Sequence, residues 1–217
     1  MRDTLEENVM VSKLIEKIQK TKAPICVGLD PMLGYIPEHV KEKAFAEFGE
    51  TLEGAAEAIW QFNCAIVDAT ADLIPAVKTQ IAMYEQFGIE GLKAYDRTVK
   101  YCQQKGLIVI GDIKRGDIAK TAEMYAMGHF TGDFESDFVT LAPYMGLDSI
   151  SPYLPYAEKQ GKGMFVLCRT SNGGAKDFEY EKLADGRHVY DLVGDKLNAL
   201  GKDYMGEHGY SSIGLVI

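Results

Sequence analysis

Long apolar runs, paired cysteines and an apolar leader are all missing from this sequence of 217 residues. No run approaches the roughly 20 apolar residues that a membrane-spanning helix needs, and the first residues mix charges in place of a signal core. The four cysteines, Cys26, Cys64, Cys102 and Cys168, include no C-x-x-C pair, which argues against a zinc site. We therefore expect a cytoplasmic protein with reduced, mostly buried thiols and with neither a membrane nor a metal ion as partner.

Positive charge is also scarce, since 23 Lys and Arg stand against 32 Asp and Glu, for a net charge of −9. This balance argues against a general binder of nucleic acid or of membrane surfaces. It leaves room for a phosphorylated substrate, because a few lysines or backbone N–H groups hold an anion inside an acidic protein. The sequence further lacks a G-x-G-x-x-G motif after its first apolar run, which removes the main support for dinucleotide binding.

Short apolar runs alternate with longer amphipathic segments along the whole chain. Continuous apolar strands between helices are typical of a parallel sheet covered on both faces. The pattern predicts strands over 24–30, 76–80, 107–112, 137–141, 163–168 and 212–217. It predicts helices over 4–20, 40–73, 90–105, 117–130, 147–160 and 187–205.

The polar residues favour a barrel over an open doubly wound sheet. Asp30, Lys78, Asp112 and Lys114 follow or end predicted strands, and in a barrel those strand ends converge on one site. A barrel has eight strands and typically about 250 residues, more than this chain supplies. We therefore expect residues 1–217 to form a single, incomplete domain of the α/β class, a (β/α)8 TIM barrel with about six of its eight β/α units.

The charged residues at the predicted strand ends form an alternating array of acids and lysines that suits one kind of reaction. Asp112 and Lys114 are two apart on an extended segment, so their side chains point to the same side, and Asp117 follows three residues later. Acids that flank a lysine keep it ionised, and Lys78 with Asp30 would extend the array. Such an array suits a reaction that forms a carbanion: an acid repels a departing carboxylate, while a lysine stabilises and then protonates the carbanion.

A simpler interpretation stays open on the pattern alone. The Asp112–Asp117 run is also typical of a solvated turn in which the second Asp caps the next helix, and Asp30 is equally consistent with a turn before Pro31. Lys78 fits this interpretation less well, because a lysine inside a covered strand is costly without a partner.

Several segments occur in an order that resembles the orotidine 5′-phosphate decarboxylase family, in its longer bacterial subgroup. The resemblance runs from about residue 10 to the end of the chain, and the D-x-K-R-G-D-I-x-x-T element is its most specific part. The segments are Val27-Gly28-Leu29-Asp30-Pro31, Lys78 with Gln80, Glu85-Gln86-Phe87-Gly88, Asp112 to Ile118 with Thr121, Pro143-Tyr144-Met145-Gly146, and Thr170-Ser171-Asn172.

The resemblance implies conversion of orotidine 5′-monophosphate to uridine 5′-monophosphate and CO2, the last step of pyrimidine nucleotide synthesis, without a metal or organic cofactor. Asp30 and Lys78 match the acid and lysine that contact the ribose and begin the charged array. Asp112 matches the acid that faces the substrate carboxylate. Lys114 matches the proton donor to C6 of the pyrimidine.

The resemblance also implies a barrel homodimer. Asp117, Ile118 and Thr121 match the segment that serves the neighbouring subunit's site, and Ser171 matches a loop serine that reads the pyrimidine edge. Family members continue past the sixth strand into a Gly-rich loop and two further strands that hold the phosphate, partly with an arginine. We therefore expect this chain to be C-terminally truncated and to turn over substrate poorly, because remote phosphate binding supplies much transition-state stabilisation.

Two alternatives to a decarboxylase of this family stay open, and they belong to different functional classes. A Mg²⁺-dependent sugar-phosphate barrel lyase, such as a keto-gulonate phosphate decarboxylase or hexulose phosphate synthase, shares the D-x-K-x-x-D strand but has an acid where this chain has Lys78, whose charge would repel the metal. The other alternative is a non-catalytic fragment that lacks the phosphate site. The roles of Arg169 and of Gly173-Gly174, a possible lid hinge, stay open.

Overall fold

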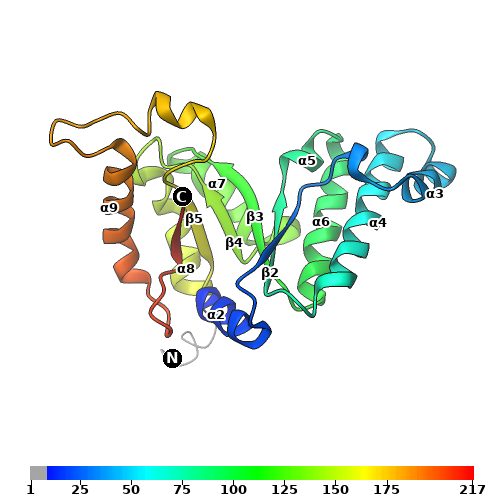
Figure 1. Cartoon of the computed structure of the whole chain (residues 1–217), viewed down its shortest axis with the longest axis horizontal. Helices are drawn as coiled ribbons and strands as arrows, with labels where there is room; N and C mark the ends of the chain where they lie inside the picture. The colour runs from blue at the N-terminus through cyan, green and yellow to red at the C-terminus, as the bar shows by residue number, and fades with distance from the viewer. Residues whose placement is uncertain (1–8) are drawn as a thin grey trace. The chain divides into compact units, whose positions relative to one another are not determined.

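The structure, a computed structural model, describes residues 9–217 (Figure 1). These residues divide into two compact units. We call 16–113 with 131–137 the N-terminal unit, and 9–15 with 114–130 and 138–217 the C-terminal unit. The single domain expected over 1–217 stays a prediction. Within the described part of the chain, no helix is both long and apolar enough to cross a bilayer.

The N-terminal unit is built on parallel strands in sequence order. Strand β1 (Cys26–Leu29) pairs with β2 (Ala76–Gln80), and β2 pairs with β3 (Ile108–Arg115), whose last two residues belong to the other unit. Helix α4 (Leu52–Thr70) packs along α6 (Gly88–Gln104), and Figure 1 shows the two side by side. The remaining helical segments are η1 (Leu33–Tyr35), α3 (Glu38–Phe48), α5 (Ala82–Glu85) and η2 (Gly132–Phe134).

The single helix predicted over 40–73 is wrong, because the structure forms α3 and α4 in its place. Gly49 ends α3 with a φ of 72°, in the region that glycine adopts without strain. Thr51 then starts α4, since its hydroxyl accepts a hydrogen bond of 3.1 Å from the backbone N–H of Gly54. The apolar period runs on across both helices, so these caps and not the periodicity decide the break.

The C-terminal unit repeats the same plan with β4 (Phe138–Leu141), β5 (Gly163–Leu167) and β6 (Ile213–Val216). Neighbouring strands in this order are parallel, with Phe138 opposite Gly163 and Val166 opposite Leu215. Its helical segments are α2 (Met10–Thr21, which reaches into the other unit), α7 (Ala119–Phe130), η3 (Leu147–Ser149), η4 (Ser151–Tyr153), α8 (Leu154–Gln160), η5 (Gly173–Asp177), α9 (Val189–Gly201) and η6 (Lys202–Tyr204).

All six predicted strands are confirmed, with ends shifted by up to three residues. The helix predicted from residue 4 is observed as α2 from Met10, and residues 4–8 lie outside the described part of the chain. The helix predicted over 147–160 is wrong in its first half, which forms the short turns η3 and η4. Pro152 contributes to this break, because it has no N–H to donate to a carbonyl of the preceding turn.

The prediction of mostly buried thiols is right for Cys102 and Cys168 and wrong for Cys26, which is exposed. Cys26 lies in β1, at the end of its unit's strand order, where most of the strand remains accessible. All four cysteines are free thiols. Burial raises the pKa of the Cys102 thiol to about 12, so this thiol stays protonated at neutral pH.

Strand β5 approaches β4 so closely that residue 163 must lack a side chain. A Cβ atom on Gly163 would lie 2.2 Å from Cε1 of Phe138. The Phe138 ring cannot easily withdraw, because it is 1% exposed and packs against Phe165 with ring centroids 5.3 Å apart. The glycine therefore allows an aromatic pair to fill the core of this unit.

We expect Gly163→Ala to lower the free energy of unfolding by about 2 kcal/mol, because the added methyl group overpacks a rigid part of the core. Urea denaturation measures this change. Gly128→Ala is the matched control: Gly128 lies on α7, and its Cβ would meet no atom within 4 Å. The control should be neutral or stabilising by up to about 1 kcal/mol, and an equal loss in both variants would contradict the packing argument.

Candidate active site

Three of the charged residues predicted from the sequence come together in the N-terminal unit. Lys78, on β2, donates through Nζ to Asp30 Oδ1 at 3.3 Å and to Asp112 Oδ2 at 3.0 Å. Gln80, two residues further on the same strand, donates through Nε2 to Asp112 Oδ2 at 3.1 Å. The strand register explains the cluster, since Gln80 lies opposite Asp112, and Asp30 directly follows β1.

The two carboxylates of this cluster differ in their exposure to solvent. The Asp112 side chain is 6% exposed, whereas that of Asp30 is 43% exposed. Burial by itself would lower the pKa of Lys78, but the hydrogen bonds and charges of Asp112 and Asp30 outweigh it and raise the pKa above its ordinary value. Lys78 is therefore charged at neutral pH and balances the buried charge of Asp112.

A buried polar network lies behind this cluster in the same unit. Tyr84 donates its O–H to the carbonyl of Leu29, the residue before Asp30, at 3.4 Å. Asn63 on α4 donates through Nδ2 to Tyr84 Oη at 2.9 Å and to Thr98 Oγ1 at 3.1 Å. Burial raises the pKa of Tyr84 far above its ordinary value, so the phenol remains protonated and able to donate.

Sequence reasoning missed this network as part of the site. Its signal was present, because Asn63 and Thr98 are polar residues on otherwise apolar helix faces. Buried polar side chains normally have hydrogen-bond partners, so a pair of such residues on two helices points to a shared partner between them. The packing of α4, α5 and α6 identifies this partner as Tyr84, on α5.

Lys114 lies on β3, two residues after Asp112, with an exposed side chain. Its φ is 46°, a left-handed conformation that is uncommon for a residue with a Cβ atom. Its backbone N–H donates to Thr140 Oγ1 at 3.0 Å. The ideal alternation assumed from the sequence is therefore interrupted at Lys114, and local backbone strain of this kind gathers at functional sites.

Asp117, Ile118 and Thr121 lie where β3 gives way to α7. Asp117 accepts the backbone N–H of the next residue, Ile118, through Oδ1 at 2.8 Å. Helix α7 begins only at Ala119, and Asp117 does not accept from the helix interior in the manner of a standard N-cap. The side chain of Ile118 is 47% exposed.

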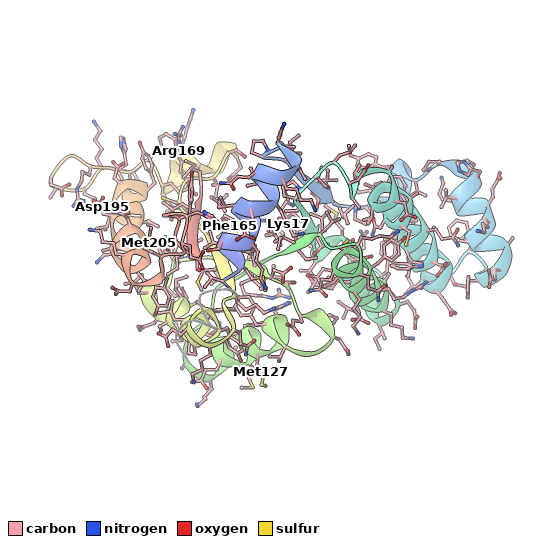
Figure 2. The ribbon with its side chains drawn as sticks, turned by 90° about the horizontal axis from the view of Figure 1, so that it is seen from below. Lys17, Met127, Phe165, Arg169, Asp195 and Met205 are labelled. Carbon is pink, nitrogen blue, oxygen red and sulfur yellow. The ribbon has the colours of Figure 1, made fainter. Side chains whose placement is uncertain are left out.

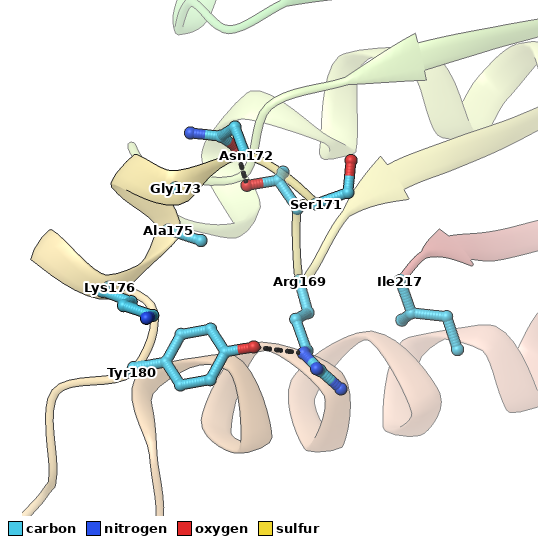
Figure 3. A pocket seen from close by; sticks show the side chains of 9 residues that line it. Arg169, Ser171, Asn172, Gly173, Ala175, Lys176, Tyr180 and Ile217 are labelled. Carbon is cyan, nitrogen blue, oxygen red and sulfur yellow. Dashed lines mark hydrogen bonds between the residues drawn. The ribbon is translucent and has the colours of Figure 1, made fainter.

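Ser171 lies on the loop that follows β5, at the edge of an open pocket of about 640 Å³ (Figure 3). Arg169, Lys176 and Tyr180 also line this pocket, and Arg169 donates through Nε to Tyr180 Oη at 2.8 Å. The pocket is lined by the hydroxyl groups of Thr170, Ser171 and Tyr180 and by two cationic side chains. Across residues 9–217, no cluster of three or more His, Cys, Asp or Glu side chains is arranged to hold a metal ion.

Residues 23–216 match the family model described as the orotidine 5′-phosphate decarboxylase / HUMPS family. The chain belongs to this family. It is 55% identical over 209 residues to an orotidine 5′-phosphate decarboxylase of Clostridium perfringens, a match that covers 96% of the chain and 70% of the relative. It is 50% identical over 210 residues to the enzyme of that name from Petrotoga mobilis, with the same coverage.

Solved structures agree with the family assignment. The Leishmania donovani OMP decarboxylase matches with a TM-score of 0.76 and 29% identity, over 96% of this chain and 70% of that one. A Plasmodium berghei orotidine 5′-monophosphate decarboxylase, at 18% identity, matches with a TM-score of 0.77 over 95% of this chain and 75% of its own, and supports the fold alone. The fold class predicted from the sequence, an α/β barrel of which about six strand–helix units are present, is confirmed.

The buried ion pair of Lys78 and Asp112 makes a testable contribution to stability. We expect Lys78→Gln to lower the free energy of unfolding at pH 7 by about 2 kcal/mol, because Asp112 loses the cation that balances its buried charge. The difference from the wild type should persist up to about pH 10.5 and shrink above it, since the raised pKa of Lys78 keeps its charge up to and beyond its ordinary value of 10.5.

The double variant Lys78→Gln/Asp112→Asn is the control for this measurement. It removes both charges, so at least half of the lost stability should return. Asp30→Asn should cost less than about 1 kcal/mol, because Asp30 is largely exposed. If the double variant were no more stable than Lys78→Gln, the loss would not come from an unpaired Asp112.

Proposed function

We propose that the cluster of Asp30, Lys78 and Asp112, followed on β3 by Lys114, is the centre at which this chain decarboxylates orotidine 5′-monophosphate. The reaction gives uridine 5′-monophosphate and CO2, in pyrimidine biosynthesis. The observation that carries the proposal is the position of Lys78, whose ammonium group bonds to both carboxylates at 3.0 and 3.3 Å. Family membership and the names of the relatives support the same activity.

The proposed roles follow from charge. The Asp112 carboxylate, paired with Lys78, faces the substrate carboxylate and repels it, which favours breaking the bond between C6 and that carboxylate. The electron pair of that bond stays on C6 as CO2 leaves. The Lys114 ammonium group stabilises this carbanion and gives it a proton, and the resulting neutral amine regains a proton from water.

Substrate binding uses further residues in this proposal. Asp30 and Lys78 contact the ribose hydroxyls, and Ser171 reads the edge of the pyrimidine. The exposed hydroxyl of Ser171 and the pocket beside it support this role.

The contacts of Lys78 also favour this reaction over that of a Mg²⁺-dependent sugar-phosphate lyase. A magnesium site would need the oxygens of Asp30 and Asp112 as ligands. Both carboxylates instead accept hydrogen bonds from Lys78, whose charge repels a cation at the same place.

We also propose that the chain acts in the cytoplasm as a homodimer, in which Asp117, Ile118 and Thr121 serve the partner's site. The surface of α7 supports a protein contact, because Met124 is 54% exposed and Met127 is 47% exposed. Figure 2 shows Met127 pointing away from the ribbon at the edge of the molecule. A second copy covering this surface would bury apolar area that is otherwise in water.

The proton-donor role predicts that Lys114→Ala abolishes the release of CO2 from orotidine 5′-monophosphate. The fold should remain, as judged by circular dichroism, because the Lys114 side chain is exposed. Lys196→Ala, an exposed lysine on α9, is the control and should retain wild-type activity. Activity above a few per cent in Lys114→Ala would rule out the role, and activity lost on adding EDTA would favour a metal-dependent lyase.

The shared site predicts that two inactive variants restore activity when mixed. Lys114→Ala and Asp117→Ala subunits, allowed to exchange, should form hybrid dimers in which one of the two sites is intact. Recovery should approach about a quarter of wild-type activity, the share expected from random pairing. No recovery, although subunit exchange is demonstrated by mass spectrometry of tagged chains, would mean that Asp117 does not cross to the partner.

A further inference from the structure

The loop after β5 is closed at its base by two neighbouring pairs of side chains. We define this loop as residues 168–180, so that Arg169 and Thr170 lie near its start and Glu179 and Tyr180 lie at its end, after η5 (Gly173–Asp177). Arg169 pairs with Tyr180, and Thr170 pairs with Glu179. Figure 3 shows Arg169 reaching across to the Tyr180 hydroxyl beneath the loop.

The pair of Thr170 and Glu179 uses both oxygens of the carboxylate. The backbone N–H of Thr170 donates to Oε2 at 2.7 Å, and its hydroxyl donates to Oε1 at 2.6 Å. Hydrogen bonds to an ionised acceptor are about twice as strong as neutral ones. The same hydroxyl lies 2.6 Å from Asn172 Oδ1, so its single hydrogen serves one of two acceptors, whereas the N–H bond to Glu179 has no such competitor among the contacts described.

Glu179 is itself anchored on the following helix. Its carbonyl accepts the backbone N–H of Tyr190, in the first turn of α9, at 3.1 Å. Its own N–H donates to the carbonyl of Ala175, a buried residue within the loop, at 2.9 Å. The guanidinium group of Arg169 lies over the rings of Tyr180 and Tyr190, at 5.5 and 5.7 Å from their centroids. The carboxylate therefore connects the start of the loop to a helix.

Ser171 directly follows the residue that Glu179 holds. Its side chain is exposed at the pocket edge, so packing does little to fix its position. A hydroxyl group contributes to binding when its position is set before the ligand arrives, because ordering a loop on binding weakens affinity. On the Thr170 side, the contacts that set the backbone next to Ser171 are those with Glu179. On the other side, the carbonyl of Asn172 accepts the backbone N–H of Ala175 at 3.1 Å.

We propose that Glu179 is a positioning residue, which holds the loop at Thr170 so that the Ser171 hydroxyl meets the edge of the pyrimidine. This inference rests on the proposed function, in which Ser171 contacts the base. Glu179 acts through Ser171 and does not touch the substrate. Arg169, with Tyr180, is the second pair that holds the base of the loop.

The test compares the binding of uridine 5′-monophosphate, by calorimetry, to the wild-type chain, Glu179→Gln, Ser171→Ala and the double variant. Glutamine keeps the shape but replaces one acceptor oxygen with a donor group. We expect Glu179→Gln to weaken binding by roughly tenfold. The double variant should bind no more weakly than Ser171→Ala, because Glu179 acts through that serine. Glu181→Gln, an exposed glutamate just past the loop, is the matched control and should bind as the wild type does.

Additive losses in the double variant would overturn the positioning role, since a general structural effect of Glu179 would persist without the Ser171 hydroxyl. Cytidine 5′-monophosphate provides a further readout, because it differs from uridine 5′-monophosphate at the base edge. The preference for the uridine nucleotide should fall in Glu179→Gln and remain in Glu181→Gln. An unchanged preference would also count against the role.

Hydrogen–deuterium exchange without ligand separates this inference from the proposed function. The segment that includes Thr170 and Ser171 should exchange faster in Glu179→Gln than in the wild type or Glu181→Gln. Unchanged exchange would show that Glu179 does not hold the loop, whatever the chain binds. If the wild type neither binds uridine 5′-monophosphate nor releases CO2 from orotidine 5′-monophosphate, the proposed function is wrong. The proposed contact between Ser171 and the substrate is then wrong as well. The exchange data still decide whether Glu179 anchors the loop.

Discussion

The negative charge of Asp112, buried within strand β3, is the constraint on which the arrangement of the N-terminal unit depends. A carboxylate that is 6% exposed is strongly destabilising without a cation. Lys78 supplies that cation from the neighbouring strand, and Gln80 supplies a further hydrogen bond from the same strand. Register, strand length and pairing must all be kept for these three groups to meet. The positions of the charged groups in the candidate site therefore depend on the register of β2 and β3.

Support for this pair extends into the layer of helices. Tyr84 reaches the carbonyl before Asp30, and Asn63 holds Tyr84 from α4. Each of these contacts is a buried hydrogen bond, so removing either partner should lower the free energy of unfolding. The C-terminal unit uses a different means for its loop after β5, where Glu179 and Arg169 hold the loop ends together with exposed or half-exposed charges. One unit therefore positions its polar groups by burial, and the other by hydrogen bonds across the base of a loop.

Much of the fold was predictable, because strand formation here depends on local composition. The run from Leu107 to Ile110 has no alternation of polar and apolar residues, which is typical of a covered parallel strand. The helix pattern over 40–73 was misleading for the opposite reason, since Gly49 and Thr51 override a continuous apolar period. Cys26 was expected to be buried from its apolar neighbours, but burial depends on the strand's place in the sheet, which composition does not contain.

The sequence by itself determined the order of strands and helices and the presence of acids and lysines on the strands or directly after them. Through its motifs it also determined the family resemblance that the comparisons confirm. These properties are local, because they follow from residue types at short spacings along the chain. Only the tertiary structure decided which charges meet: that Lys78 bridges Asp30 and Asp112, that Tyr84 supports Leu29, and that Glu179 returns to Thr170. Those contacts join residues far apart in the chain, so they depend on strand register, helix packing and loop closure.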